Sequence, residues 1–204
     1  MINKKEIIWR EILYQSLEKK VYRFTQKDLA KKFSFSLSTV FNALKVPREN
    51  KAIEVTGRDF KVRDTKKLLF IWATFRRLQK DVIFSGFTNL PITEIKNSLP
   101  PETIFTVYSA FIKRFKEVPA DYDKIYIYLS KKNLPEIRKR FTFKKGTPNL
   151  FILEPDPFLK KYGKLTTLGQ TFVDLWNLPE WFAADFSKAL EEKIETILAW
   201  TYNL

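Results

Sequence analysis

The stretch from Phe24 to Pro47, FTQKDLAKKFSFSLSTVFNALKVP, most constrains the fold, because it predicts two short helices joined by a tight turn. Thr25 is a good N-cap, since its hydroxyl can accept a hydrogen bond from the free N–H groups that begin a helix. The helix expected over residues 26–33 would turn three residues inward: Leu29, Ala30 and Phe33. Ser36 can cap the second helix, which we expect over residues 37–45.

The second predicted helix has two different faces. At about 100° per residue, its inward face consists of four apolar residues: Leu37, Val40, Phe41 and Leu44. The outward face is small, polar and free of acids, and it comprises Ser38, Thr39, Asn42 and Ala43, with Lys45 at its edge. A helix that lies in the major groove needs such a face, because base edges and phosphates both reject carboxylates. The pair therefore indicates DNA binding, and the alternative is two amphipathic helices of an ordinary bundle.

A β-hairpin is predicted after this pair, over residues 51–63. Apolar and polar residues alternate on both sides of the turn Thr56-Gly57-Arg58-Asp59, as they do in short antiparallel strands. Such a hairpin is unstable alone and must pack on the helices. A third helix, expected over residues 3–20 and capped by Asn3, would complete a three-helix core. Arg58 at the tip, with Lys61 and Arg63 beside it, would contact a phosphate or enter a minor groove.

The charge of the chain favours the same interpretation. The formal net charge is +14, and residues 1–80 carry 20 Lys and Arg against 8 Asp and Glu, whereas residues 81–204 carry 17 against 15. The positive field is therefore expected around the helix pair, where it would attract phosphates. The chain has no Cys and no His, which excludes zinc fingers, thiol nucleophiles, disulfides and His-based acid–base chemistry. Without a signal peptide or an 18-residue apolar run, we expect a cytoplasmic protein that does not enter a membrane.

The remaining sequence predicts a bridging helix and then a second domain. Asp64 can cap a helix over residues 65–80, whose last turn, from Arg76 to Lys80, is expected to be a solvated helix end. Strands are expected at residues 81–86, 103–107, 124–130 and 149–153, and helices after Pro91 and at residues 108–116, 134–140, 166–176 and 180–201. The fold class is therefore α+β: a winged helix-turn-helix domain at 1–64, a bridging helix at 65–80, and at 81–204 a small mixed α/β domain with a short sheet covered by helices.

Catalytic chemistry finds little support in the second half. The acidic pairs Asp121/Asp123 and Glu154/Asp156 both sit in Pro-containing turns, where such residues commonly act as caps. The five Gly are scattered singly, so no phosphate-binding glycine loop is present, and without His a Ser nucleophile would need a Lys base. We expect no enzymatic activity, no metal and no cofactor.

A second basic cluster lies between residues 131 and 145, KKNLPEIRKRFTFKK. Its basic residues are Lys131, Lys132, Arg138, Lys139, Arg140, Lys144 and Lys145, with Phe141 and Phe143 interleaved as candidates for exposure. The cluster would contact an acidic partner protein or a second stretch of nucleic acid. The alternative is a solvated helix face beside an edge strand that lysines protect from pairing.

The motifs described above carry two resemblances. The order LAKKFSFSLSTVFNAL resembles the helix-turn-helix of winged-helix transcription regulators, although no Gly lies in the turn. The whole arrangement is similar to the winged-helix antitoxins of type IV, or abortive-infection, toxin–antitoxin systems, through residues 24–63, Ile83-Phe84-Ser85-Gly86, and TTLGQTFVDLW with Asp174-Leu175. This resemblance implies a first domain that binds operator repeats and represses its own operon, and a second that neutralises a nucleotidyltransferase-like toxin.

The sequence thus predicts a sequence-specific regulator that binds double-stranded DNA, with a toxin or other protein partner and a homodimer as further expectations. The residues expected to contact DNA are Thr25, Gln26, Lys27, Ser36, Ser38, Thr39, Asn42, Lys45, Arg58, Lys61 and Arg63. Two alternatives stay open: a protein–protein adaptor that uses a winged helix, and an antitoxin that acts mainly through its C-terminal domain.

Overall fold

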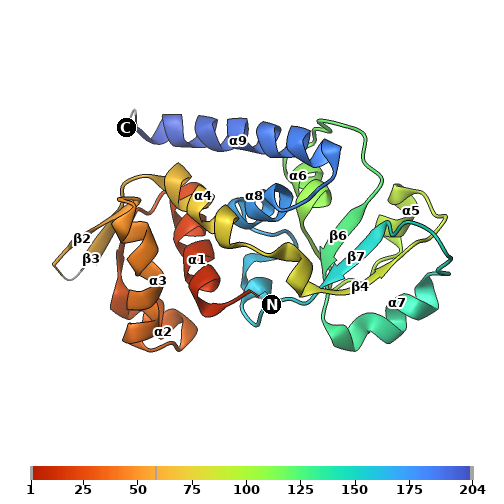
Figure 1. Ribbon diagram of the computed structural model, residues 1–204, viewed down its shortest axis with the longest axis horizontal. Helices are drawn as coiled ribbons and strands as arrows, with labels where there is room; N and C mark the ends of the chain where they lie inside the picture. The colour runs from red at the N-terminus through yellow and green to blue at the C-terminus, as the bar shows by residue number, and fades with distance from the viewer. Residues whose placement is uncertain (1, 58, 203–204) are drawn as a thin grey trace. The chain divides into compact units, whose positions relative to one another are not determined.

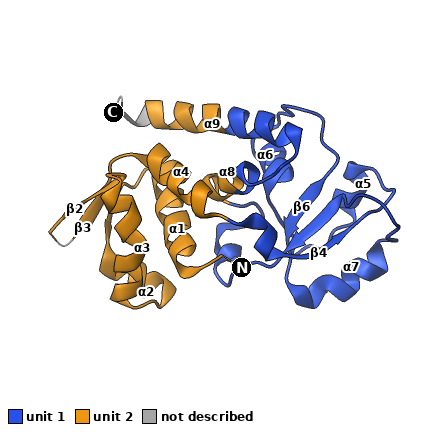
Figure 2. Ribbon diagram, in the orientation of Figure 1, with its two compact units in different colours: residues 1, 77–166, 174–190 blue, residues 2–76, 167–173, 191–204 orange. Residues whose placement is uncertain are grey.

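The computed structural model describes residues 2–57 and 59–202, and its class is α+β (Figure 1). The chain divides into two compact units, which do not follow the order of the sequence (Figure 2). Unit 1 contains residues 77–166 and 174–190, and unit 2 contains residues 2–76, 167–173 and 191–204.

The division differs from the expected domain boundaries. The sequence places residues 81–204 together, but two segments of that range, 167–173 and 191–204, group with the N-terminal helices. The helix expected as a bridge over 65–80 ends at Phe75 and lies in unit 2.

Unit 2 consists of helices and one small antiparallel sheet. Its elements are α1 (Lys4–Glu18), β1 (Arg23–Thr25), α2 (Gln26–Phe33), α3 (Leu37–Glu49), β2 (Ile53–Thr56), β3 (Asp59–Val62) and α4 (Thr65–Phe75), with the first part of α8 (Leu168–Trp176) and the last part of α9 (Trp181–Tyr202). The strand order is β1-β3-β2. The predicted hairpin β2–β3 is confirmed, whereas β1 was not expected, because three residues are too short to show a pattern.

The predicted helix starts of unit 2 are confirmed. Four side chains accept a hydrogen bond from the backbone N–H three residues later: Asn3, Thr25, Ser36 and Asp64. The prediction of a solvated helix end is wrong for Arg76, whose side chain is buried. Its backbone is extended, with ψ 137°, so α4 stops there and the side chain points into the protein rather than into solvent.

The late segments of the chain pack closely on the N-terminal helices of unit 2. Gly169 lies so near Leu13 and Trp72 that an added Cβ would be 3.2 Å from the Leu13 side chain, tighter than most real contacts. Phe172 meets the edge of the Phe70 ring at 5.5 Å between centroids. These contacts make residues 167–173 part of the core that α1 and α4 form.

Unit 1 is built on a four-stranded sheet of order β4-β7-β6-β5. Its elements are β4 (Val82–Gly86), α5 (Ile92–Asn97), β5 (Ile104–Phe105), α6 (Val107–Phe115), β6 (Ile125–Tyr128), α7 (Leu134–Arg140) and β7 (Leu150–Leu153), with the last part of α8 and the first part of α9. Three short 3-10 helices lie at Leu78–Asp81, Lys131–Asn133 and Leu159–Tyr162. Strands β6 and β7 run parallel, and the other neighbours are antiparallel. The predicted small sheet covered by helices is confirmed.

Successive side chains of β6 point to opposite faces of the sheet, and both faces are buried at this strand. Ile125 and Ile127 belong to an apolar cluster that includes Ile95 of α5 and Ile137 of α7. Tyr126 and Tyr128 point the other way, because successive residues of a strand face opposite sides. Since all four residues of β6 are buried, this sheet is covered on both faces.

Two acids lie beneath the tyrosine face of β6. The Tyr128 and Thr106 hydroxyls both donate to Oδ2 of the fully buried Asp174, each at 2.9 Å. Glu180 accepts from the Tyr126 hydroxyl at 2.7 Å and from the Lys124 ammonium at 2.9 Å. These bonds compensate the burial of the two carboxylates and connect β6 to the helices on this side.

The surroundings of Glu180 lower the pKa of its carboxyl group. Burial alone would raise the pKa of this carboxyl, but the hydrogen bonds from Lys124 and Tyr126 outweigh burial and hold the pKa below its ordinary value. Burial, followed by the neighbouring Glu180, raises the pKa of the Tyr126 hydroxyl far above its ordinary value, so this group stays protonated and donates.

Because the folded-state pKa of Glu180 is depressed, its contribution to stability is present above its unfolded pKa of about 4.3 and is lost as the pH falls through the folded value. We expect Glu180→Gln to lower the free energy of unfolding by about 1–3 kcal/mol at pH 7. The difference from the wild-type chain should shrink below about pH 4. The two free energies of unfolding are measured with urea between pH 3 and 7. Glu136→Gln is the control, because Glu136 pairs with Arg140 at the surface. A difference that stays constant over this range would contradict the assignment.

Candidate nucleic-acid interface

The turn between α2 and α3 forms without glycine. Ser34 adopts the left-handed conformation at φ 55°, which ends α2. The Phe35 N–H then donates to the Ala30 carbonyl at 2.9 Å, the six-to-one bond of a Schellman motif. The Phe33 and Phe35 rings stack at 5.6 Å across this bond. Hydrogen bonding and ring packing together compensate the strain of a non-glycine residue in this conformation.

The first turn of α3 contains a cluster of hydroxyl groups. Ser36 Oγ accepts from the Thr39 N–H at 3.2 Å and lies 2.9 Å from both Ser38 Oγ and Thr39 Oγ1. Ser38 is exposed and Thr39 is half-buried. Ser36 is exposed as well but is occupied as the cap, so among these three hydroxyls Ser38 is the exposed one without a capping role.

The faces of α3 differ from the prediction. Ala43, expected outward, is buried, whereas Leu37 and Phe41, expected inward, are 57% and 46% exposed. The cause is α1: the Trp9 indole N–H donates to the Ala43 carbonyl at 2.8 Å, and a small side chain at this position lets Trp9 approach. The buried stripe of α3 is consequently Val40, Ala43, Leu44 and Pro47.

Pro47 explains why the Ala43 carbonyl is free to bind Trp9. In a regular helix this carbonyl would accept from the N–H of the residue four positions later, but that residue is Pro47, which has no N–H. Trp9 supplies the missing donor. Helix α3 therefore continues through Pro47 to Glu49, four residues beyond its predicted end.

The outward face of α3 combines polar, apolar and basic side chains. Exposed along it are Leu37, Ser38, Phe41, Asn42, Lys45 and Arg48. The Arg48 guanidinium lies over the Phe41 ring at 5.3 Å from its centroid, which keeps its charge on this face. Arg48 is not among the residues predicted to contact DNA, although its position, seven residues after Phe41 and three after Lys45, places it on the same side of a helix.

The hairpin offers less free positive charge than predicted. Arg63 pairs with Glu54, and Lys61 lies directly across the sheet from Arg23 on one side and Glu54 on the other. Both predicted contacts therefore share their surface with an acid. Gly57 takes the positive φ of 63° that the predicted turn requires. Arg58, the predicted tip contact, lies outside the described residues.

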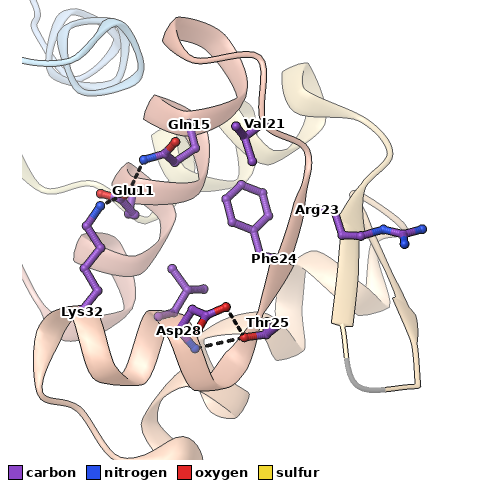
Figure 3. Close-up of a pocket in the computed structure, with 9 residues that line it drawn as sticks. Glu11, Gln15, Val21, Arg23, Phe24, Thr25, Asp28 and Lys32 are labelled. Atoms are coloured by element: carbon purple, nitrogen blue, oxygen red, sulfur yellow. Dashed lines mark hydrogen bonds and ion pairs between the residues drawn. The ribbon is translucent and has the colours of Figure 1, made fainter.

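Two of the three residues predicted to contact DNA at the start of α2 are hydrogen-bonded within the protein or partly buried. The Thr25 hydroxyl donates to the Asp28 carboxylate at 2.7 Å and accepts from its N–H at 3.0 Å, at the edge of a pocket of about 180 Å³ (Figure 3). Across this pocket, the buried Glu11 accepts from Gln15 and from the Lys32 ammonium. Lys27 is exposed and Gln26 is half-buried. Of the three predicted residues, Lys27 is thus the accessible one.

Charge is distributed more evenly between the two compact units than between residues 1–80 and 81–204. Unit 2 carries 19 basic against 11 acidic side chains, a net charge of +8, and unit 1 carries 18 against 12, a net charge of +6. Three acids of α9 join unit 2, namely Glu191, Glu192 and Glu195, and Lys66 pairs with the first and the last of these. The asymmetry between residues 1–80 and 81–204 is thus largely compensated within the compact units, so a local basic surface must carry any argument for DNA.

The second basic cluster lies on and around α7. Its seven basic residues are all exposed, but Arg140 pairs with Glu136 and donates to the Ser98 carbonyl. The expected exposure of the two phenylalanines is wrong: Phe141 is buried in the apolar cluster, and Phe143 meets the edge of the Phe84 ring at 4.9 Å. Phe141 is thus a core residue, whereas Phe143 is half-buried and packs against the cluster, where Gly86 leaves room for its ring.

Among residues 2–57 and 59–202, no three His, Cys, Asp or Glu side chains gather as a metal site. In the same part of the chain, no helix combines the length and apolar character needed to cross a membrane. No family model, curated protein or solved structure matches the chain.

Proposed function

We propose that unit 2 is a winged helix that binds double-stranded DNA with α3 in the major groove, and that the protein is a transcription regulator. The observation that carries this proposal is the outward face of α3, where Ser38, Asn42, Lys45 and Arg48 are exposed and no carboxylate precedes Glu49. A helix at the edge of a small hairpin, with polar and basic side chains outward, suits a groove lined by base edges and phosphates.

Each exposed side chain has a role in this arrangement. The Asn42 amide can bond an adenine edge with two hydrogen bonds, and Leu37 and Phe41 offer apolar contacts to thymine methyl groups. Lys45 and Arg48 would contact phosphates, which fix the register of the helix on the duplex. The mixed face thus supports recognition of sequence as well as affinity.

A second candidate function rests on the same face. Leu37 and Phe41 are large apolar side chains exposed side by side on α3, one helical turn apart, and such residues also mark protein–protein contacts. If these two residues contact a partner protein instead of DNA, the chain is a protein–protein adaptor. The resemblance to winged-helix antitoxins adds a partner for unit 1, a toxin whose acidic surface would meet the exposed lysines of the 131–145 cluster.

Salt dependence separates DNA binding from the adaptor function. The full-length protein is required, because unit 2 includes residues 167–173 and 191–204. Sequences are selected from a random duplex pool, and the dissociation constant of the best one is measured by fluorescence anisotropy between about 50 and 200 mM salt. With roughly three to six phosphate contacts, the logarithm of affinity should fall with a slope of about −3 to −5 against the logarithm of salt.

A matched random duplex serves as control for sequence specificity. The selected duplex should bind more tightly than the random one at every salt concentration, with a similar slope, because phosphates rather than bases release counterions. Binding that does not change with salt, or no enrichment of any sequence, would leave the adaptor as the better interpretation of α3.

A further inference from the structure

One pocket of unit 1 is lined by residues that are neither among those proposed to contact DNA nor among the basic residues around α7. It has a volume of about 380 Å³ and lies where the end of α5, β5 and α6 meet the segment before α8. Its lining residues are Lys96, Leu99, Pro100, Pro101, Thr103, Phe105, Lys113, Lys164 and Leu165. All of them belong to unit 1, so the pocket is complete within one compact part of the chain.

Three lysines converge on this pocket and no carboxylate lines it. Each ammonium has a neutral neighbour: Lys96 donates to the Tyr122 hydroxyl at 3.1 Å, Lys164 donates to the Pro101 carbonyl, and Lys113 lies 4.5 Å from the centroid of the Phe105 ring. Within the part of the chain that the structure describes, none of the three is paired with an acid, although Glu102 shares the adjacent hollow with Lys164. The pocket therefore holds positive charge that an anion could neutralise.

A buried hydroxyl gives an independent sign of a ligand. Thr103 lines the pocket with only 3% of its surface exposed, and its Oγ1 has no hydrogen-bond partner among the described residues. A buried hydroxyl without a partner is unfavourable, and proteins satisfy nearly all such groups with protein, water or ligand atoms. The Oγ1 atom itself is enclosed, with less than 1 Å² of accessible surface. A rotation of the Thr103 side chain about χ1 would turn the hydroxyl toward the lysines, where a ligand oxygen would supply the missing partner.

The remaining wall is apolar and partly aromatic. Leu99, Pro100, Phe105 and Leu165 give the pocket a surface for a carbon skeleton or a ring rather than for an ion alone. Its volume is within the range of small-molecule sites, which combine an apolar lining with a few convergent polar groups. We propose that this pocket binds a nucleoside monophosphate, with the phosphate held by the three lysines and Thr103, and the nucleoside against the apolar wall. The inference goes beyond DNA binding by unit 2 and does not depend on it.

Calorimetry on the full-length protein tests the proposal, with AMP, GMP, CMP and UMP as probes and inorganic phosphate and adenosine as controls. At least one nucleotide should bind, inorganic phosphate should bind at least about tenfold more weakly, and adenosine should not bind, because both parts of the ligand contribute. Binding of phosphate as tight as that of every nucleotide would overturn the proposal in favour of a simple anion site. No binding of any of the four nucleotides would overturn it as well.

Variants then locate the site. Lys113→Gln combined with Lys164→Gln should raise the nucleotide dissociation constant by about tenfold or more, whereas Lys139→Gln, an exposed lysine of α7, should leave it unchanged. Thr103→Val should also weaken binding, yet the melting temperature of the free protein should stay the same or rise, because the variant removes an unsatisfied hydroxyl. Equal effects of the pocket variants and Lys139→Gln would place the nucleotide elsewhere and overturn the assignment, as would unimpaired binding by Thr103→Val.

Discussion

Replacing Trp9 with Ala is expected to lower the free energy of unfolding by about 3–5 kcal/mol, because it removes a fully buried indole from the core of unit 2. Urea unfolding followed by far-UV circular dichroism measures this loss without relying on the removed fluorophore. Trp181→Ala is the matched control, since the Trp181 side chain is 71% exposed. We expect the control to stay within about 0.5 kcal/mol of the wild-type chain.

The hydrogen bond of Trp9 can be separated from its packing. Trp9→Phe keeps most of the ring but leaves the Ala43 carbonyl without its donor, and should cost about 1–3 kcal/mol. In Pro47→Ala, position 47 regains an N–H that reaches the same carbonyl within the helix. The cost of Trp9→Phe should therefore be smaller in the Pro47→Ala background, by at least about 0.5 kcal/mol. Equal costs in both backgrounds would show that Trp9 does not replace the missing donor of Pro47.

Reversing the charges of Lys45 and Arg48 to Glu is expected to weaken DNA binding by about 3–6 kcal/mol, if each contributes one charge-assisted phosphate bond. This corresponds to about two to four powers of ten in the dissociation constant. The loss should be similar on the selected and random duplexes, because phosphate contacts carry no sequence information. Asn42→Ala should differ in kind, with a loss of about 1–3 kcal/mol on the selected duplex and little on random DNA.

The basic residues around α7 provide the control for this experiment. Lys139→Glu combined with Lys144→Glu changes the net charge by the same amount on exposed residues of unit 1. If α3 binds DNA, this control should lose little affinity. A control as weak as the α3 variant would mean that α7 belongs to the DNA-binding surface, or that binding depends on overall charge. A loss for Asn42→Ala that is equal on both duplexes would show that its amide does not contact a base.

Local signals in the sequence were sufficient for most individual elements. Thr25 and Ser36 cap the helices that they were expected to cap, and α7 begins at Leu134 and ends at Arg140 as predicted. These features depend on neighbours within three or four residues, which one sequence displays directly. Exposure of Ser38, Asn42 and Lys45 follows from the same short-range pattern.

The orientation of α3 was beyond local signals. Leu37 and Phe41 are apolar and lie near the buried stripe, so periodicity alone favours turning them inward. The actual orientation depends on Trp9, which is 34 residues from Ala43 in the sequence. The same limit explains the unit boundaries: the bond from the Arg10 guanidinium to the Gln170 side chain spans 160 residues, and no pattern within α1 indicates it. Tertiary contacts of this kind decide which side chains of α3 are buried. Arg48, in contrast, follows the helical spacing and was missed because the helix was predicted to end at Lys45.

The return of the late segments to unit 2 has a consequence during synthesis on the ribosome. Helices α1 to α4 emerge first, but residues 167–173 and 191–202, which join them in unit 2, are translated later. At about 5–20 residues per second, the ribosome needs on the order of ten seconds to proceed from α4 to the end of α9. During this interval the apolar surface that Phe172 covers beside Phe70 stays open to chaperones. A nascent chain that stops before residue 167 would therefore lack Phe172 beside Phe70 and would leave this apolar surface of unit 2 uncovered.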